Sequence, residues 1–282
     1  MTTFAETAPP PNAVAFRDVR HGVLASGDAS SGGSISVTGD GGRTWRVVLR
    51  TRRPVSSVAY AGARIVWAGF DRGKSLRSSD GGLTWRRPAA GRFAASASFA
   101  DERRGLAVAG PFGGGSGPLR IALTDDGGRT WRVRAGPCPV PVGFNAFVSR
   151  PTANLAWVLC VGQGGAGNEG KAVYRSRDGG RSWHALGRDG LSSYGYPVGI
   201  SVAANGFGLL WETRGTLFVT RDGGRTWRGR PSLVRPEIDF GRSAVALPHG
   251  VGYELDGRGN LRIRLLATRD AGRTWRVVHR WR

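Results

Sequence analysis

Residues 38–45 read Thr-Gly-Asp-Gly-Gly-Arg-Thr-Trp, and five further copies of this eight-residue phrase follow, beginning at Ser78, Thr124, Ser176, Thr220 and Thr268. Each copy has Ser or Thr first, Asp third, Gly fifth, Thr or Ser seventh and Trp last, and successive tryptophans lie 40 to 52 residues apart. A chain that repeats at this period is built from one supersecondary unit used many times. Among all-β proteins, a period of about 40 to 50 residues is typical of propeller blades.

The composition also indicates many short strands. The 282 residues include 46 glycines and a single methionine, and stretches with helical periodicity are scarce, as in chains of strands joined by tight turns. We therefore predict an all-β fold, a six-bladed β-propeller of four-stranded antiparallel blades with one copy of the phrase in each blade. The propeller is expected to form a single domain over residues 13–282, preceded by an extended segment over residues 1–12.

The first unit shows how a blade is assembled. Strands are predicted over residues 13–16, 22–26, 34–38 and 44–49, and the phrase forms the turn between the third and fourth strands. Its Asp-Gly and Gly-Gly pairs accept positive φ, and its Asp carboxylate can accept hydrogen bonds from backbone N–H groups of the same turn. The fourth position of the phrase is Gly in five copies and Ala271 in the last, which indicates that glycine is favoured there but not required.

The tryptophan of each copy is expected to wedge between neighbouring sheets and to bury about 200 Å² of surface. The Asp and Trp of each phrase are therefore interpreted as structural residues. They are Asp40 and Trp45, Asp80 and Trp85, Asp126 and Trp131, Asp178 and Trp183, Asp222 and Trp227, and Asp270 and Trp275.

The phrase resembles the Asp-box, also called the BNR repeat, and the resemblance covers nearly the whole chain from about residue 13. It implies a β-propeller whose boxes lie at the blade periphery, away from the binding face. Asp-box propellers include sialidases, sortilin-type sorting receptors, some endoglucanases and the photosystem II assembly and stability factor. One box per blade at compact spacing is more similar to the assembly-factor type than to a sialidase, in which boxes are fewer and less regular.

A sialidase-like glycoside hydrolase is the alternative function. That resemblance would imply three arginines that grip a carboxylate, a Tyr nucleophile paired with a Glu, and an Asp acid/base. The Phe/Tyr-Arg-Ile-Pro phrase of such enzymes is met only by the stretch 16–19, Phe-Arg-Asp-Val, which we interpret as a strand-end turn. Of the five tyrosines, only Tyr194 and Tyr196 fall in a predicted loop near a carboxylate, Asp189. We expect a non-enzymatic protein and assign no catalytic residue.

Neither a metal nor a cofactor is predicted. The four histidines lie far apart, and none has metal-type spacing to a second ligand. Residues 165–170 match the pattern G-x-G-x-x-G, but the strand-like residues 171–176 follow where a dinucleotide site needs a helix N-terminus.

The charge balance favours acidic or anionic partners. The chain has 41 Lys and Arg against 20 Asp and Glu, which gives a net charge of +21. Thirteen of the basic residues occupy fixed repeat positions and would be spread around the ring. No nucleic-acid-recognition motif accompanies the charge, so nucleic acid is not an expected partner.

The binding surface is predicted on the face opposite the boxes. There the connections between second and third strands, and between successive blades, vary in length and composition, as in loops that a rigid scaffold displays for recognition. We expect a protein or an anionic ligand to bind; the alternative is that these charges are solvated and keep the protein soluble. The candidate binding residues are Arg50, Arg52, Arg53, Arg72, Lys74, Arg92, Arg188, Tyr194, Tyr196 and Arg214.

Cys138 and Cys160 are the only cysteines, and a disulfide or two buried thiols are equally compatible with their positions. The chain opens without a secretory signal and contains no convincing membrane helix, so the protein is either cytoplasmic or extracytoplasmic after removal of a leader. We expect a monomer. Its ring is predicted to close by packing of blade six on blade one, with residues 1–12 as a source of an extra strand.

Overall fold

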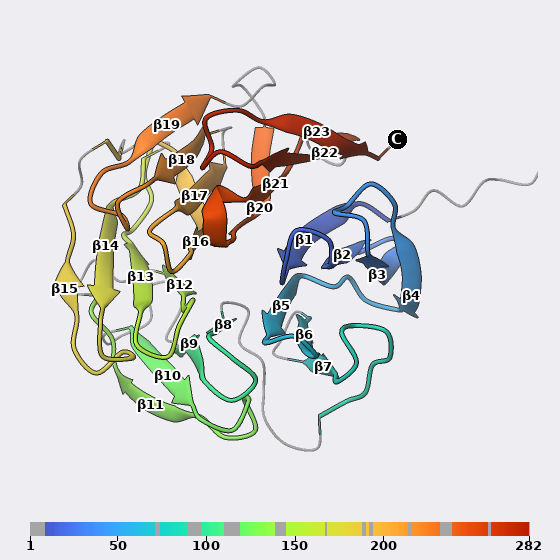
Figure 1. The fold of residues 1–282 in the computed structure, drawn as a ribbon, viewed down its shortest axis with the longest axis horizontal. Coiled ribbons are helices and arrows are strands. Elements are labelled where there is room, and N and C mark those ends of the chain that lie inside the picture. The colour runs from blue at the N-terminus through green and yellow to red at the C-terminus, as the bar shows by residue number, and fades with distance from the viewer. Residues whose placement is uncertain are drawn as a thin grey trace, which may run out of the picture.

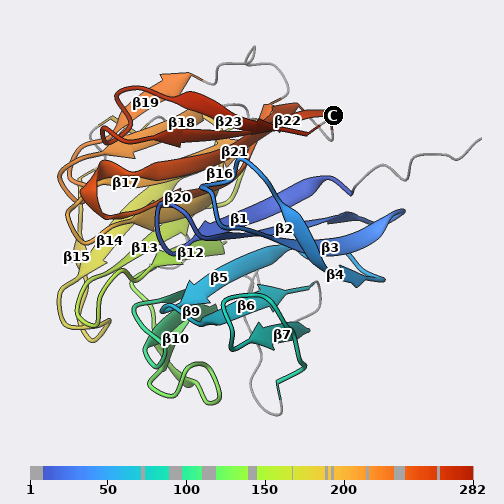
Figure 2. The ribbon, with the colours of Figure 1, turned by 45° about the vertical axis from the view of Figure 1, so that its right-hand side comes forward.

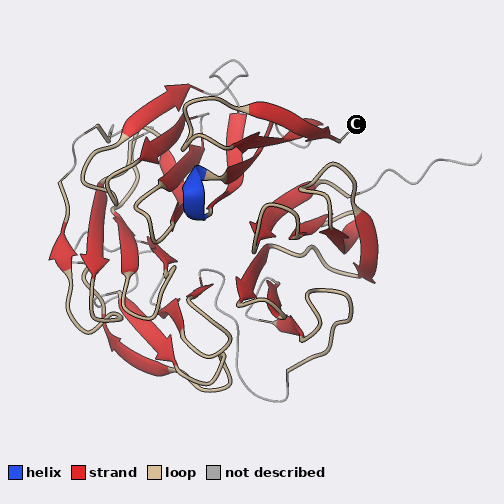
Figure 3. Cartoon of the chain, viewed as in Figure 1, coloured by secondary structure: helices blue, strands red, loops and turns tan. Residues whose placement is uncertain are grey.

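The computed structural model describes residues 9–70, 74–88, 97–109, 119–138, 145–166, 168–187, 190–191, 194–213, 216–231, 239–258 and 261–281. Antiparallel sheets form six blades around a central axis (Figures 1 and 3). Within the described residues, helix is limited to one short 3-10 turn, Pro248–Gly250. The predicted all-β, six-bladed propeller is confirmed.

Each blade is laid down in chain order from the axis to the rim, and the first strands of neighbouring blades contact one another around the axis. The strands are β1 (Pro11–Phe16), β2 (Gly22–Asp28), β3 (Gly32–Thr38) and β4 (Arg46–Thr51) in blade one; β5 (Ser57–Ala61), β6 (Ile65–Gly69) and β7 (Ser75–Ser78) in blade two; β8 (Ala97–Phe99), β9 (Gly105–Ala109), β10 (Arg120–Thr124) and β11 (Arg132–Ala135) in blade three; β12 (Asn145–Ser149), β13 (Ala156–Val161), β14 (Lys171–Ser176) and β15 (His184–Ala185) in blade four; β16 (Tyr196–Val202), β17 (Gly208–Thr213), β18 (Thr216–Thr220) and β19 (Arg228–Pro231) in blade five; and β20 (Asp239–Ala246), β21 (Gly252–Arg258), β22 (Leu261–Thr268) and β23 (Arg276–Arg280) in blade six.

Two blades depart from the regular pattern. Blade two has three strands, and its predicted fourth strand is reduced to a single bridge between Arg77 and Arg86. Pro88 follows two residues later, and a proline cannot donate the N–H that would extend the pairing. Blades five and six are joined into one sheet by a single backbone pairing, Thr213 with Phe240.

Each Asp-box is a hydrogen-bonded turn between the third and fourth strands, as blade one illustrates. The Thr38 hydroxyl donates to Asp40 Oδ1 at 2.8 Å and accepts from the N–H of Gly42 at 3.0 Å. The Asp40 carboxylate also accepts from the N–H groups of Arg43 and Thr44, and from the Thr44 hydroxyl at 2.6 Å. Hydrogen bonds from the hydroxyl and N–H of Thr44 hold the pKa of Asp40 well below its usual value. The charged carboxylate therefore organises the turn.

The first glycine of each box is fixed to the turn between the first two strands of the same blade. Its N–H donates to a carbonyl of that turn, as Gly41 does to Arg20 O at 2.9 Å, and the same bond recurs in the other five blades. The residue at this position of the box has a positive φ, which is 77° for Gly41 and 56° for Ala271 in blade six. The face that carries the boxes, here called the box face, is thus braced in the same way all round the ring.

The box tryptophans lie between neighbouring blades, where each packs into a core shared with the preceding blade. Trp45 packs with residues of blades six and one, and Trp85 with residues of blades one and two. Trp227 is the most buried of the six and packs against Trp157 of blade four. The boxes therefore dock blades as well as closing hairpins.

The ring closes at a seam between blades six and one (Figure 2, where the blue strands of blade one lie between the red strands of blade six and the teal strands of blade two). The Tyr253 ring stacks on Phe16 with centroids 3.7 Å apart, and its hydroxyl donates to Val19 O at 2.8 Å. In the described residues β1 pairs with β2 alone, so side chains and not a shared strand join the two blades. Closure by packing of blade six on blade one agrees with the prediction. Of residues 1–12, the predicted source of an extra strand, Pro11 and Asn12 open β1, and residues 1–8 lie outside the described residues.

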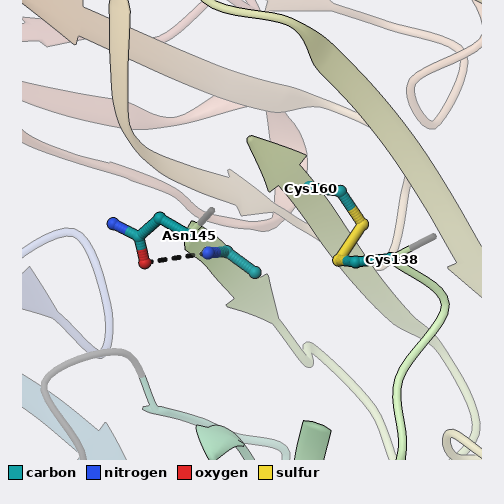
Figure 4. Close-up of a disulfide and its surroundings, with 4 residues drawn as sticks. Cys138, Asn145 and Cys160 are labelled. Carbon is teal, nitrogen blue, oxygen red and sulfur yellow. Dashed lines mark hydrogen bonds between the residues drawn. A yellow bond between two sulfur atoms is a disulfide. The ribbon is translucent and has the colours of Figure 1, made fainter. Parts of the chain in front are cut away.

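Cys138 and Cys160 form a disulfide that links the connection after β11 to the second strand of blade four (Figure 4). Both half-cystines are buried in the core shared by blades three and four. Beside them, at the start of β12, the Asn145 side chain accepts a hydrogen bond from the N–H of Ala146 at 2.8 Å. The disulfide thus closes a covalent loop across the interface between two blades.

Candidate binding surfaces

A cavity of about 780 Å³ runs along the axis of the ring and is lined by the first strands of all six blades. Small side chains dominate its wall. At four of the blade junctions, a serine of one inner strand accepts a hydrogen bond from the backbone of the next blade. We call these contacts the serine links. They join Arg150 N–H to Ser98 Oγ (2.9 Å), Val202 N–H to Ser149 Oγ (2.9 Å), Ala246 N–H to Ser201 Oγ (3.0 Å) and Val14 N–H to Ser243 Oγ (3.1 Å).

The charged groups of this channel are committed to structure. Asp18 accepts hydrogen bonds from the N–H groups of Arg20 and His21, both at 2.8 Å. Although partial burial opposes them, these bonds lower the pKa of Asp18 to about 2. Tyr60 also lines the channel, and burial raises its pKa to about 12, so its phenolate is disfavoured. Among the described lining residues Asp18 is the one carboxylate, and no Tyr-Glu pair is assembled there.

The predicted binding residues fall at two separate places on the face opposite the boxes, here called the loop face. Arg50 lies in β4, Arg52 and Arg53 follow it, and Lys74 precedes β7, so these four exposed side chains belong to blades one and two. Tyr194 and Tyr196 begin blade five, in another part of the ring (Figure 1). The remaining predicted residues, Arg72, Arg92, Arg188 and Arg214, lie outside the described part of the chain.

Beneath Tyr194 lies a buried ion pair that sequence reasoning missed. Lys171 Nζ, at the start of β14, lies 2.9 Å from Glu212 Oε1, near the end of β17, and both side chains are almost fully buried. The same ammonium donates to the carbonyl of Tyr194 at 3.0 Å. Burial raises the pKa of Glu212 to about 7, against the opposing effect of Lys171.

This arrangement gives the loop face an exposed aromatic residue on an anchored backbone. The Tyr194 carbonyl accepts a hydrogen bond from Lys171, while the residue remains 50% exposed. An exposed tyrosine on a fixed backbone offers a large contact area at little cost in conformational entropy. Signals for the ion pair were present in the sequence: Lys171 is one of only two lysines, and Glu212 ends the longest uncharged stretch.

A second buried charge group, between blades five and six, was also missed. Arg230 of β19 pairs with Glu254, and Arg264 of β22 pairs with Asp256 at 2.7 Å. The Arg230 guanidinium also lies over the Trp275 ring, 4.7 Å from its centroid. Burial raises the pKa of Glu254 to about 7, against the charge of Arg230.

Residues 256–259, Asp-Gly-Arg-Gly, have the composition of a turn. Asp256 is nevertheless buried in β21, whose pairing with β22 continues to Arg258 and Leu261. The long hairpin therefore moves the turn further along the chain.

The described residues contain no group of three or more His, Cys, Asp or Glu side chains placed to hold a metal ion. No helix in this part of the chain is long and apolar enough to cross a membrane.

Comparisons with known proteins agree with the fold. The family model of the BNR/Asp-box repeat matches residues 174–185, which contain the fourth box. A search of curated proteins gives no match. Among solved structures, YCF48 from Cyanidioschyzon merolae is 17% identical with a TM-score of 0.54, covering 96% of this chain and 85% of that chain. YCF48 bound to D1 peptide is 18% identical with a TM-score of 0.51, covering 96% and 82%.

An enzyme is also similar in structure. The GH74 enzyme of Niastella koreensis is 17% identical with a TM-score of 0.57, covering 94% of this chain but only 46% of that chain. At such identities, likeness to any of these proteins shows the fold alone, and the function has to be argued from the site.

Proposed function

We propose that this propeller is a non-enzymatic binding protein that presents its loop face to an acidic segment of a protein partner. The observation that carries the proposal is the contrast between the two faces. On the box face the same backbone hydrogen bond braces all six blades, whereas the loop face carries connections that differ from blade to blade. Variable loops on a rigid frame are the usual location of recognition sites.

The side chains of the loop face suit a protein partner. Tyr194 supplies an exposed aromatic anchor, and tyrosine is enriched where protein interfaces gain most of their energy. Arg50, Arg52, Arg53 and Lys74 add positive charge at blades one and two. Such rim charges steer an acidic partner and accelerate its association. A similar propeller has been solved with a peptide bound, which supports this class of partner.

The hydrolase alternative finds less support. Most glycosidases use two carboxyl groups on either side of the scissile bond. The described lining of the channel offers only Asp18, whose oxygens accept backbone N–H bonds. The likeness to a GH74 enzyme concerns the fold and brings no pair of carboxylates with it.

The proposal can be tested by site-specific photocrosslinking in the native host. A benzophenone amino acid would replace Tyr194 on the loop face or, as the matched control, Leu83, which is 49% exposed in the second Asp-box. We expect a discrete crosslinked protein from position 194 only, and we expect its yield to fall when Arg50, Arg52 and Arg53 are all changed to Glu. Crosslinking from position 83 alone, or a yield unaffected by the charge reversal, would contradict the proposal.

A further inference from the structure

A second cavity, of about 410 Å³, opens between blades three and four on the box face, away from the proposed partner-binding loops. We call it the interblade cleft. Five arginines line it: Arg104, Arg132 and Arg134 from blade three, and Arg150 and Arg181 from blade four. Among the described residues that line it, the carboxylates are those of Asp125 and Asp178, so positive charge there exceeds negative charge by three.

The two carboxylates are already engaged. Asp125 pairs with Arg132. Asp178 is the acid of the fourth Asp-box, and its oxygens accept hydrogen bonds from Ser176, Arg181 and Ser182. Those bonds, led by the ones from Ser182, hold the pKa of Asp178 well below its usual value, so it stays charged and inside its turn. Both acids thus already interact with arginines of the cleft, Asp125 also with the charge of Arg150, and three guanidinium charges remain in excess.

Arg150 forms the buried wall of the cleft, with only 5% of its surface exposed. It donates to the carbonyl oxygens of Gly105 at 2.8 Å and Ala153 at 3.0 Å, and so bridges the two blades. Its Nε is buried without an acceptor among the described residues. Arg150 lines the axial cavity as well as the cleft, and its Nε atom is fully buried, so Arg150 contributes positive charge to the cleft and not a hydrogen bond from Nε.

The remaining guanidinium groups point to a role that the repeat does not explain. Arg132 and Arg181 stand at positions that are basic in most boxes, but Arg104 and Arg134 do not. The residue before the second strand is arginine only in blades two and three, as Arg64 and Arg104. The place of Arg134 is arginine in only one other blade, as Arg230 of blade five. Arg134 has no ion-pair partner in the described structure, and Arg104 has only the exposed Asp101 at 3.7 Å.

We propose that the interblade cleft binds a small molecule that carries two or more phosphoryl groups. Guanidinium groups donate in planar forks that match phosphate oxygens. Here they come from four places: the turn before β9, strand β11, the end of β12 and the fourth box. A single planar carboxylate is satisfied by one or two forks in its own plane, whereas tetrahedral phosphoryl groups accept from several directions. The volume suits a small ligand and not a folded partner.

The test is isothermal titration of the full chain with inorganic tripolyphosphate at an ionic strength of about 0.15 M, where the Debye length is ~8 Å, with citrate as the carboxylate for comparison. We expect one site, preference for tripolyphosphate over citrate, and an affinity loss of at least about tenfold in R104Q/R134Q, because each charged hydrogen bond is worth more than ~1 kcal/mol. Both side chains are exposed, so this variant should fold, and its thermal unfolding would verify that.

A matched pair of variants separates a built site from general charge attraction. Arg181 and Arg225 occupy the same position in the fourth and fifth Asp-boxes, but only Arg181 lines the cleft. We expect R181Q to weaken tripolyphosphate binding and R225Q to leave it within about twofold, since a distant surface charge is screened. Equal losses in both variants, tighter binding of citrate, or no binding to the unmodified protein would each overturn the proposal.

Discussion

The stability of the seam can be tested at Tyr253, whose ring stacks on Phe16 and whose hydroxyl bonds Val19 O across blades six and one. Tyr253→Phe should cost only about 1 kcal/mol, because it removes one hydrogen bond and Val19 is exposed enough for water to replace the donor. Tyr253→Ala should cost about 4 to 5 kcal/mol, since it leaves a cavity in a buried cluster and removes a stacked ring. Urea unfolding would measure both losses.

Hydrogen exchange would show where the structure opens. In Tyr253→Ala, we expect amide protection to fall most in β1 and β20, which face each other across the seam. The control is Leu106→Ala, at the matching position of blade three, where chain connectivity holds the neighbouring blades together. A uniform rise in exchange over all six blades, or unchanged protection of β1 and β20, would refute the view that side chains alone hold this junction closed.

Three further predictions concern single features of the fold. Ala271→Gly should stabilise the protein by roughly 0.5 kcal/mol, because Ala271 has a φ of 56°, which glycine adopts without strain. Gly41→Ala should destabilise it by about 2 kcal/mol, because the added Cβ would lie 2.8 Å from Val19 O. Thermal unfolding of the two variants would measure both effects. Replacing Cys138 and Cys160 by Ala should lower the unfolding free energy in urea by about 3 kcal/mol, because the disulfide closes a 22-residue loop, and reductant should then affect only the unmodified protein. Folding raises the pKa of Glu212 from 4.5 to about 7, so the folded state holds a proton that the unfolded state releases. The free energy of unfolding should therefore fall by roughly 2 to 3 kcal/mol as the pH rises from 4.5 to 7. The double variant K171M/E212L should abolish this pH dependence, and a pH profile unchanged in that variant would contradict the assignment.

The blades could be predicted from the sequence because their information is local. Each Asp-box encodes a turn, a hydrogen-bonding carboxylate and an interblade tryptophan within eight residues, so a single copy already indicates a hairpin. Six copies at a regular period then fix the number of blades. The exceptions are local too: Pro88 ends the pairing of blade two, and the pairing of β21 with β22 overrides the turn-like residues after Asp256.

The candidate sites were harder to predict because they depend on which blades become neighbours. The contact between Lys171 and Glu212 joins two blades, and no short-range pattern connects the two residues. Two groups of residues shared a predicted face, yet they occupy different parts of the ring: Arg50, Arg52, Arg53 and Lys74 in one, and Tyr194 and Tyr196 in the other. A face can be inferred from strand order, but a position around the axis requires the closed ring.

The repeat itself separates structural charge from charge that invites another explanation. An arginine at a position that is basic in most boxes, such as Arg181, needs no ligand to explain it, because the repeat itself carries that residue. Arg104 and Arg134 each have an arginine counterpart in only one other blade, Arg64 and Arg230, and with the buried Arg150 they line one cavity together with two box arginines. Arginines of neighbouring blades also approach one another elsewhere, as Arg77 does Arg129 and Arg221 does Arg273, but in the interblade cleft five guanidinium groups line one cavity. Because like charges placed together destabilise a fold unless something compensates them, a bound anion is the compensation that the interblade cleft is built to accept.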